Sequence, residues 1–367
     1  MPVRLRYTFL FCMMLFSAFP AFAQIAMPDN TCVGSMRHYW VNGAASSTFT
    51  WKIDGVVQPE TSNDIFRTWT LAGNYSLEVQ EHSSFGCDGA VISGQVVVNP
   101  KPLVTFSLCT DPVTTTAAQP FVLRGGLPLG GTYTGNGTNA GSFNPSLAGA
   151  GNHIITYSYI NTWGCADSAT QLINVNDPAA FTCGNPLTDI RDNRQYPTVK
   201  LGSQCWLAAN LNYGTFISST LMQRDNCFAE KYCFNDDPSN CNSYGGLYQW
   251  DEIMQYNTAE AVQGFCPPGW HVPTENDWNL LFSLYTNNAF AGGALKSTGA
   301  SGFNAFLFGS RFNNKNWNFG NFAVNFWSST THGPDKAWAH GMNSFDPGVS
   351  YYPSGKNNAF HLRCLMD

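Results

Sequence analysis

The segment from Cys266 to Phe282 constrains the fold more than any other part of this 367-residue chain. The stretch before Thr274 contains three prolines, Pro267, Pro268 and Pro273. They hold its backbone extended, because proline fixes φ. Thr274 suits the N-cap of a helix, and the Asp277 carboxylate can reach back to the Thr274 amide. Apolar residues then recur at helical spacing, at Trp278, Leu281, Phe282 and Tyr285. The segment predicts a capped amphipathic helix over 274–286 that packs Trp278 in a core.

Five motifs that contain cysteine or tryptophan follow one another in the C-terminal half. They cover Thr198–Asn212, Glu230–Asp251, Cys266–Trp278, Phe326–Thr330 and Leu362–Leu365. In this order they resemble the Fibrobacter succinogenes major paralogous domain, a family of extracellular modules common in Bacteroidetes-type bacteria. The Pro-Thr-Glu-x-x-Trp helix start and the Trp-Ser-Ser strand also resemble the C-type lectin-like fold of sugar-binding domains and formylglycine-generating enzymes. The resemblance implies an α+β C-type lectin-like domain over 181–367, but a shared fold does not fix function.

The N-terminus has the pattern of a secretory signal peptide over residues 1–23. Arg4 and Arg6 form a charged end, 9–19 is apolar, and the small residues at 21 and 23 predict cleavage after Ala23. The apolar run is too short for a stable membrane span. We therefore expect a secreted or cell-surface protein without a membrane span.

The charge balance argues against nucleic-acid partners. Removal of the signal takes away two of 18 basic residues, which leaves 16 against 24 acidic residues and a net charge of −8. A nucleic-acid-binding protein needs clustered Lys and Arg to displace phosphate counterions, and here they are scattered. Charged residues make up only 11% of the chain, which is typical of a β-rich secreted protein with polar loops.

Two blocks before the C-terminal domain read as all-β immunoglobulin-like sandwiches, over 24–99 and 100–176. In the first, the strand segments are 49–53, 73–79 and 94–98, and Cys32, Trp51 and Cys87 follow the Cys, Trp, Cys order of such sandwiches. This block resembles the polycystic-kidney-disease-like domains of bacterial surface proteins. In the second, we expect strands at 121–123, 131–134, 153–159 and 171–175. Its glycine-rich segment is not a phosphate loop, because no Gly-Lys-Ser/Thr follows.

The cysteines favour an oxidising compartment and fall into domain-sized groups. The bracketing of each block predicts Cys32 with Cys87 and Cys109 with Cys165, and a disulfide between the blocks would argue against this division. The family resemblance implies two further pairs, Cys233 with Cys241 and Cys266 with Cys364. The pairing of the remaining three stays open, with a preference for Cys183 with Cys205 and with Cys227 as a candidate free thiol. The spacings of a structural zinc site are absent, so no metal ligands are assigned.

Candidate catalytic groups are present, but structural roles account for them better than catalytic ones. The available carboxylates are Asp251, Glu252, Glu275 and Asp277. The first two are adjacent on a short helix, so their side chains diverge, and the other two suit a first helical turn. A Cys-His nucleophile would need a free thiol beside one of His271, His332, His340 or His361, and export and disulfide pairing argue against it. We assign no catalytic residue and no cofactor.

Binding fits the composition of the late loops better than turnover does. Aromatic and amide side chains between 311 and 352 suit sugar recognition, because a pyranose offers an apolar face and a rim of hydroxyls. The candidate ligand-binding residues are Asn316, Trp317, Asp335, Asp346, Tyr351 and Tyr352. Calcium at Asp335 or Asp346 is an open alternative, although the Glu-Pro-Asn and Trp-Asn-Asp signatures of calcium-dependent lectins are absent. The same residues could instead be solvated loop amides and core aromatics.

Taken together, the sequence predicts an exported binding or adhesion protein in which two β-sandwiches form a stalk for a lectin-like head. Its expected partner is an extracellular glycan or a surface protein. The alternatives are a glycan-active hydrolase and a structural component of an extracellular assembly.

Overall fold

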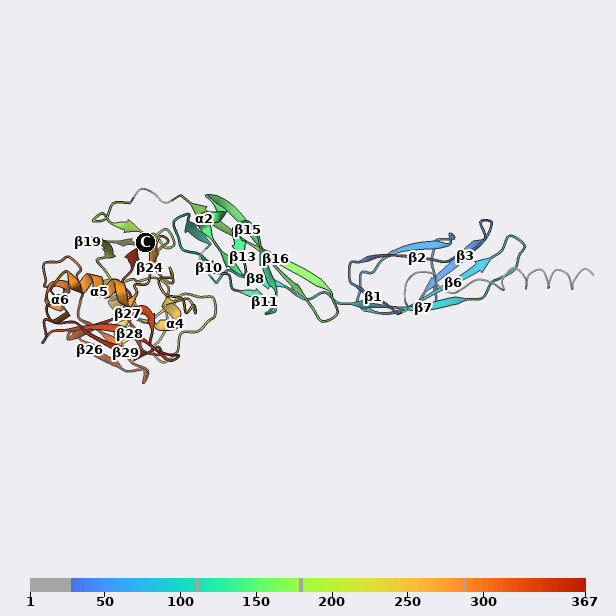
Figure 1. Ribbon diagram of the computed structural model, residues 1–367. Coiled ribbons are helices and arrows are strands. Elements are labelled where there is room, and N and C mark those ends of the chain that lie inside the picture. The colour runs from blue at the N-terminus through green and yellow to red at the C-terminus, as the bar shows by residue number, and fades with distance from the viewer. Residues whose placement is uncertain (1–27, 110–111, 178–180, 287) are drawn as a thin grey trace, which may run out of the picture. The chain divides into compact units, whose positions relative to one another are not determined.

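The computed structural model describes residues 28–109, 112–177, 181–286 and 288–367, in which strands outnumber helices (Figure 1). The predicted signal peptide, 1–23, lies outside the described residues. Contacts divide the described chain into two units, one with 28–104 and 158–168 and the other with 105–157 and 169–367. No helix among the described residues is long and apolar enough to cross a membrane.

The first unit contains two β-sheets over its described residues. The larger has the order β1 (Asp29–Cys32), β7 (Ile92–Asn99), β6 (Gly73–His82), β3 (Thr48–Ile53) and β4 (Val56–Val57). The smaller pairs β2 (Met36–Trp40) with β5 (Asp64–Thr68). Alternate residues of the central strands are buried, among them Trp51, Leu77 and Val96, each fully inaccessible. The predicted strands of this block are therefore confirmed.

The predicted pairing of Cys32 with Cys87 is wrong, because the sheet holds these residues at opposite ends. β6 pairs with β7 from Gly73 opposite Val98 onward, and β1 runs parallel to β7 with Cys32 opposite Asn99. Cys32 therefore lies where β6 begins, whereas Cys87 follows the end of β6. Ten strand residues span about 33 Å, and a disulfide needs Cα atoms within about 7 Å.

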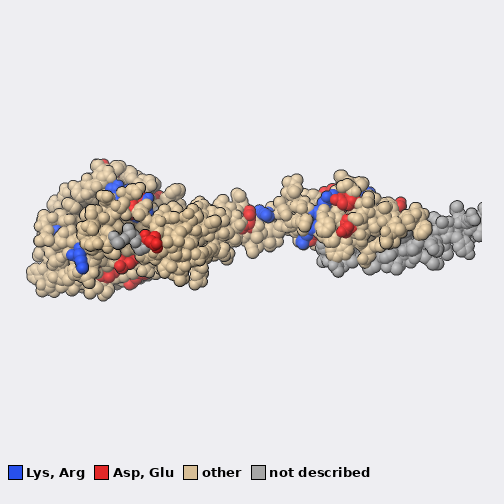
Figure 2. Space-filling view, turned by 90° about the horizontal axis from the view of Figure 1, so that it is seen from above, with Lys and Arg blue, Asp and Glu red and all other residues tan. Residues whose placement is uncertain are grey.

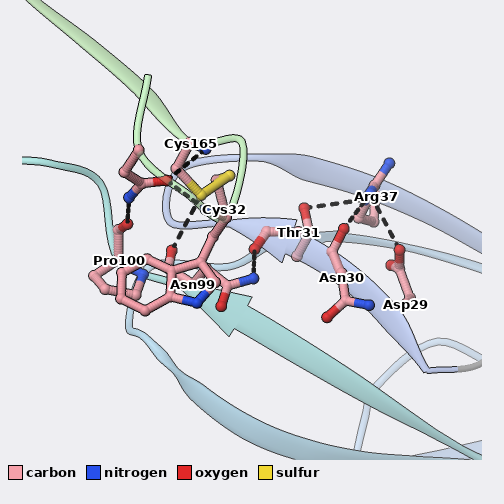
Figure 3. The surroundings of a disulfide bond; sticks show 10 residues. Asp29, Asn30, Thr31, Cys32, Arg37, Asn99, Pro100 and Cys165 are labelled. Atoms are coloured by element: carbon pink, nitrogen blue, oxygen red, sulfur yellow. Dashed lines mark hydrogen bonds and ion pairs between the residues drawn. A yellow bond between two sulfur atoms is a disulfide. The ribbon is translucent and has the colours of Figure 1, made fainter. Parts of the chain in front are cut away.

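Cys32 instead bonds to Cys165, with the Cα atoms 5.6 Å apart (Figure 3). Cys165 lies at the tip of the hairpin formed by β15 (Gly151–Ile160) and β16 (Ala166–Asn176). Only this tip, residues 158–168, belongs to the first unit. Asn161 accepts a hydrogen bond from the Cys165 amide at 2.9 Å and donates one to the Pro100 carbonyl at 3.0 Å. This disulfide joins the two predicted blocks, and such a link argues against their division at residue 100.

The second unit begins with short strands and includes the rest of this hairpin, residues 151–157 and 169–176. One sheet has the order β12 (Thr132–Thr134), β15, β16 and β9 (Val113–Thr115). Smaller sheets join β10 (Phe121–Val122), β14 (Ser142–Phe143) and β13 (Thr138–Asn139), and also β11 (Gly126–Leu127) and β8 (Thr105–Phe106). A single short helix, α2 (Pro145–Ala148), follows β14 in this part of the described chain. The strands expected at the four sequence segments are all present.

The C-terminal domain is built on a seven-stranded sheet. Its order is β23 (Tyr248–Gln249), β30 (Ala359–Phe360), β25 (Phe308–Arg311), β27 (Ala323–Thr331), β28 (Lys336–Asn343) and β29 (Ser350–Gly355), with β26 (Trp317–Gly320) paired to β25. A second sheet has the order β19 (Thr198–Leu201), β20 (Gln204–Leu207), β31 (Leu365–Met366) and β24 (Trp270–His271). The helices are α3 (Pro238–Tyr244), α4 (Trp250–Ile253), α5 (Glu275–Ser283) and α6 (Asn288–Leu295). Helices and sheets thus occur together here, whereas the lectin-like topology stays a prediction.

Helix α5 begins as the sequence predicts. The Thr274 hydroxyl accepts a hydrogen bond from the Asp277 amide at 3.1 Å, and the Asp277 carboxylate accepts one from the Thr274 amide at 2.8 Å. These two bonds satisfy amides that a helix start would otherwise leave unpaired. Trp278 is fully buried, 4.9 Å from Trp206 and 4.9 Å from His340 between ring centroids. The helix therefore covers one face of the larger sheet with the apolar side that its spacing predicts.

Three of the predicted disulfides of this domain are confirmed. They join Cys183 with Cys205, Cys233 with Cys241 and Cys266 with Cys364. The prediction of Cys109 with Cys165 is wrong, because Cys109 bonds to Cys227. Cys227 is therefore not a free thiol.

The disulfide pattern can be tested by peptide mapping under non-reducing conditions, which should recover Cys32 with Cys165. The double variant Cys32→Ala/Cys165→Ala should lower the free energy of unfolding by about 2 to 5 kcal/mol, because the bond limits the unfolded chain. Ser168→Ala, an exposed change in the same hairpin, should cost less than about 0.5 kcal/mol. Recovery of a peptide that joins Cys32 to Cys87 would contradict the strand register.

Trp278→Ala should destabilise the C-terminal domain by about 3 to 5 kcal/mol, because it leaves a cavity among Trp206, Phe282 and Phe326. Phe345, which is 84% exposed, provides the matched control. Phe345→Ala should change the free energy of unfolding by less than about 0.5 kcal/mol. Equal chemical denaturation midpoints for the two variants would show that Trp278 is not a core residue.

Candidate functional site

The six predicted ligand-binding residues do not converge on one site. Asn316 and Trp317 lie at β26, which pairs with β25, whereas Tyr351 and Tyr352 lie on β29, which pairs with β28. β27 separates β25 from β28 in the sheet. A single ligand surface over all six residues would therefore have to cross several strands.

Asp335 and Asp346 lie beyond opposite ends of β28 and cannot share one calcium ion. An eight-residue strand separates them by about 26 Å. Asp346 accepts a hydrogen bond from the Gly348 amide at 2.8 Å and so shapes the loop before β29. Among the described residues, no group of three or more His, Cys, Asp or Glu side chains is arranged to hold a metal ion.

Trp317 and Tyr352 both contribute to packing. The Trp317 ring is half-buried and meets the Phe234 ring edge-on at a centroid distance of 5.3 Å. The Tyr352 hydroxyl donates to the Asn325 side-chain oxygen at 2.6 Å, and burial raises the pKa of Tyr352 to about 12. Replacement of Trp317 would therefore disturb local packing as well as any ligand contact.

A row of aromatic rings on β28, on β29 and in the turn before β28 is better placed to meet a ligand. It consists of His332, Trp338 and Tyr351, here called the aromatic strip. The ring centroid of Trp338 is 5.0 Å from that of His332 and 5.9 Å from that of Tyr351. Tyr351 is 56% exposed, His332 is exposed and Trp338 is half-buried. Apolar rings that remain accessible in a row are typical of binding surfaces.

The strand register places polar groups beside the aromatic strip. Tyr351 lies opposite His340, so both side chains point to the same face of the sheet. The buried His340 ring contacts the Glu275 carboxylate at 3.0 Å, and the Glu275 amide donates to the Thr330 hydroxyl at 3.0 Å. Glu275 lies in the first turn of α5 and its side chain is 23% exposed. A carboxylate and aromatic faces thus occur together where α5 begins.

Sequence reasoning considered His332 only as a base and missed Trp338. The signal was present in Lys336-Ala-Trp-Ala-His340, because a tryptophan between two alanines on a strand faces the side opposite to them. Both alanines are fully buried. The alternation thus directs the large ring away from the alanine face.

The carboxylates considered for hydrolysis are held by their surroundings. Glu252 is only 2% exposed, and its oxygens accept hydrogen bonds from the Glu230 amide and the Tyr256 hydroxyl, both at 2.9 Å. Burial raises the pKa of Glu252 to about 7 and also raises the pKa of Asp251. The cavity beside Glu252 measures about 180 Å³, below the usual 300 to 1,000 Å³ of ligand pockets. Glu252 could give up a proton near neutral pH, but both of its oxygens already have partners.

The Cys-His alternative loses its nucleophile, because no free thiol occurs among the described cysteines. His271 lies between two carboxylates, 2.7 Å from Asp367 and 3.4 Å from Asp277. His361 is fully buried, which lowers its pKa to about 4, and its ring contacts the Gly246 carbonyl. These two histidines therefore have structural partners.

A comparison with known families identifies one match, in the C-terminal half. The family model described as the Fibrobacter succinogenes major domain matches residues 199–366, which confirms the predicted resemblance of the C-terminal half. A comparison with curated proteins gave no match.

Several solved structures are similar to parts of the chain at low identity. Fibronectin(III)-like modules of Clostridium thermocellum CbhA are 14% identical, with 20% of this chain and 92% of that chain covered and a TM-score of 0.18. The SGBP-B protein of a Bacteroides ovatus mixed-linkage glucan utilization locus, solved with a heptasaccharide, is 19% identical, with 44% and 46% covered and a TM-score of 0.19. A Ca²⁺-stabilized adhesin by which an Antarctic bacterium binds ice is 13% identical, with 52% and 63% covered and a TM-score of 0.23. This chain spans less than two thirds of the last two proteins, and TM-scores this low do not establish a common fold.

The His271 cluster predicts a pH dependence of stability. Burial lowers the pKa of His271, but hydrogen bonds to Asp277 and Asp367 outweigh it and raise the pKa to about 9. The pKa of His271 in the folded protein lies above its unfolded value of about 6.5. The contribution of protonated His271 to the free energy of unfolding is therefore complete below about pH 6.5 and is lost as pH rises through 9. We expect wild type to exceed His271→Gln by about 2 to 3 kcal/mol of unfolding free energy at pH 6 and by much less at pH 9.5. A difference that is the same at both values would mean that the charge of His271 does not contribute.

Proposed function

Because residues 199–366 match the Fibrobacter succinogenes major domain, we propose that this chain is an exported binding protein whose C-terminal domain holds a glycan on the aromatic strip. The observation that supports this most is the accessible ring of Tyr351, which extends the Trp338 and His332 rings along the sheet. Tyr and Trp suit such contacts because they offer a rigid apolar face with a polar edge.

The chemistry around the aromatic strip suits a neutral, hydroxyl-rich ligand. Glu275 and Thr330 supply oxygens that can accept or share hydrogen bonds with hydroxyl groups, while the rings offer stacking faces. Most of the surface in view in Figure 2 carries neither acidic nor basic side chains. A ligand that is recognised by stacking and hydroxyl contacts needs no strong charge complement. Asp335, which lies in the turn between His332 and β28, is a further candidate for a hydroxyl contact.

Tyr351→Ala and Trp338→Ala should each weaken glycan binding by about 1 kcal/mol, or roughly fivefold in Kd, because each removes one stacking face. Glycan-array screening of the full chain would identify a neutral ligand, and calorimetry would then measure the variants. Phe345→Ala is the control, because this ring is 84% exposed and outside the aromatic strip. Unchanged binding in both strip variants would exclude this surface.

Incubation of the full chain with the glycan identified on the array also distinguishes binding from the two alternative functions, a hydrolase and a structural component. Release of a shortened product that stops in Glu252→Gln would favour a hydrolase, because Glu252 is the described carboxyl whose pKa is raised to about 7. Absence of glycan binding together with self-association of the full chain would favour a structural component.

A further inference from the structure

A second hollow in the C-terminal domain lies away from the aromatic strip, around Lys231. It measures about 600 Å³, and the lining side chains that matter are those of Asp192, Arg194, Asn212, Tyr213, Phe228 and Lys231, here called the Lys231 hollow. This volume falls within the usual range of ligand pockets, about 300 to 1,000 Å³.

The strands explain how the hollow is built. Lys231 lies on β22 (Glu230–Lys231), which runs parallel to β21 (Thr215–Phe216). Because side chains alternate along a strand, Lys231 faces away from the side on which Glu230 lies. Arg194 lies in the turn between β17 (Leu187–Thr188) and β18 (Gln195–Tyr196). Two cationic side chains from separate segments thus line the same space.

The positive charges of the hollow are not fully matched by protein carboxylates. Among the described residues, no carboxylate forms an ion pair with Lys231, whose ammonium donates to the Asn212 carbonyl at 3.1 Å. Arg194 lies 4.0 Å from Asp192, at the limit of an ion pair, and both side chains are about one third exposed. Burial and then the charge of Arg194 lower the pKa of Lys231 to about 8, while Asp192 opposes them. An anion between the two cations would relieve this repulsion.

Asn212 is a buried residue beside Lys231 whose side-chain amide is unpaired. The residue is 3% exposed, yet neither its side-chain nitrogen nor its side-chain oxygen has a hydrogen-bond partner. A buried amide without partners costs about 1 to 3 kcal/mol, so such groups usually serve a ligand or an ordered water. Asn212 lines the same hollow as Lys231 and Arg194. The hollow thus gathers an amine and a guanidinium, and Asn212 is tied to the amine through its backbone carbonyl, which accepts from the Lys231 ammonium.

We propose that the Lys231 hollow binds a carboxylate group, held between the Lys231 ammonium and the Arg194 guanidinium. This site goes beyond the aromatic strip and does not depend on it. A guanidinium and a carboxylate match in geometry, and charge-assisted hydrogen bonds are the stronger ones.

The wall of the hollow favours a uronic acid sugar as the carrier of the carboxylate. The Phe228 ring is 73% exposed and lines the same space, so it can stack on the apolar face of a sugar ring. A peptide C-terminus carries a carboxylate too, but it does not present a flat apolar ring face to Phe228. The hollow therefore suits an acidic sugar at the end or side of a polysaccharide.

Calorimetry with D-galacturonate, D-galactose and N-acetylglycine tests the proposal on the full chain at pH 7. We expect galacturonate to bind at least about tenfold more tightly than the other two, and Lys231→Met and Arg194→Gln each to weaken it at least about fivefold. Lys200→Met, an exposed change in the same domain, should bind like wild type. If galactose bound as tightly as galacturonate, the assignment of a carboxylate ligand would be wrong. If N-acetylglycine bound more tightly than galacturonate, the assignment of a sugar as the carrier of the carboxylate would be wrong.

Two further readouts separate a ligand site from a structural lysine. Folding disfavours the charged form of Lys231, so Lys231→Met should raise the melting temperature at pH 7 while binding is lost. Galacturonate should also bind more weakly at pH 9.5 than at pH 7, because Lys231, with its pKa lowered to about 8, loses its charge. The other charged or titratable side chains of this wall are those of Arg194, Asp192 and Tyr213. A melting temperature that falls in Lys231→Met would assign the lysine to folding. Tyr351→Ala and Trp338→Ala should leave galacturonate binding unchanged, so failure of the aromatic strip does not affect this result.

Discussion

The buried guanidinium of Arg363 holds the C-terminal domain together. It is inaccessible to solvent and donates to the Leu207 and Asn304 carbonyls at 2.9 and 2.7 Å, to the Phe303 carbonyl, and to the Asn210 side-chain oxygen at 2.7 Å. No carboxylate neutralises it among the described residues, and burial lowers the pKa of Arg363 to about 9. Removal of these acceptors would leave an unpaired charge in the core, which is strongly destabilising.

Arg363 thereby sets the positions of the elements that surround the aromatic strip. Its neighbour Cys364 is bonded to Cys266 just before the lead-in to α5, and β31 pairs with both β20 and β24. The start of α5 is thus fixed from two directions. Helix α5 packs on His340 and begins at Glu275. Trp338 lies two residues away from His340 on β28, beyond the start of the helix, and so is not covered by it. The exposure of the aromatic strip follows from where the helix starts.

A feature of the fold or of a candidate site is predicted from the sequence when the residues that determine it are close together in the chain. The Thr274 cap and the apolar spacing of α5 involve residues within a few positions of each other, so helix and core face are both predicted. The Cys32 partner depends on which end of a sheet each cysteine occupies, and that information comes from the pairing of β1 with β7. The Lys231 hollow brings together residues from 192 to 231 that no common motif marks. Trp338 is an intermediate case. The sequence shows the alternation that turns its ring away from the two alanines, but it does not show where the helix that packs on the sheet begins.

The disulfide between Cys32 and Cys165 also determines how the chain carries mechanical load. These residues are 133 positions apart, and a pull that reaches Cys32 from the N-terminal side passes through the sulfur bridge to Cys165. A pull at the other end, beyond Cys227, also acts on Cys109, which lies between these two residues and is bonded to Cys227. The two disulfides thus provide two covalent routes between Cys32 and Cys227, one through Cys165 and one through Cys109, so no single stretch of backbone between them carries the whole load.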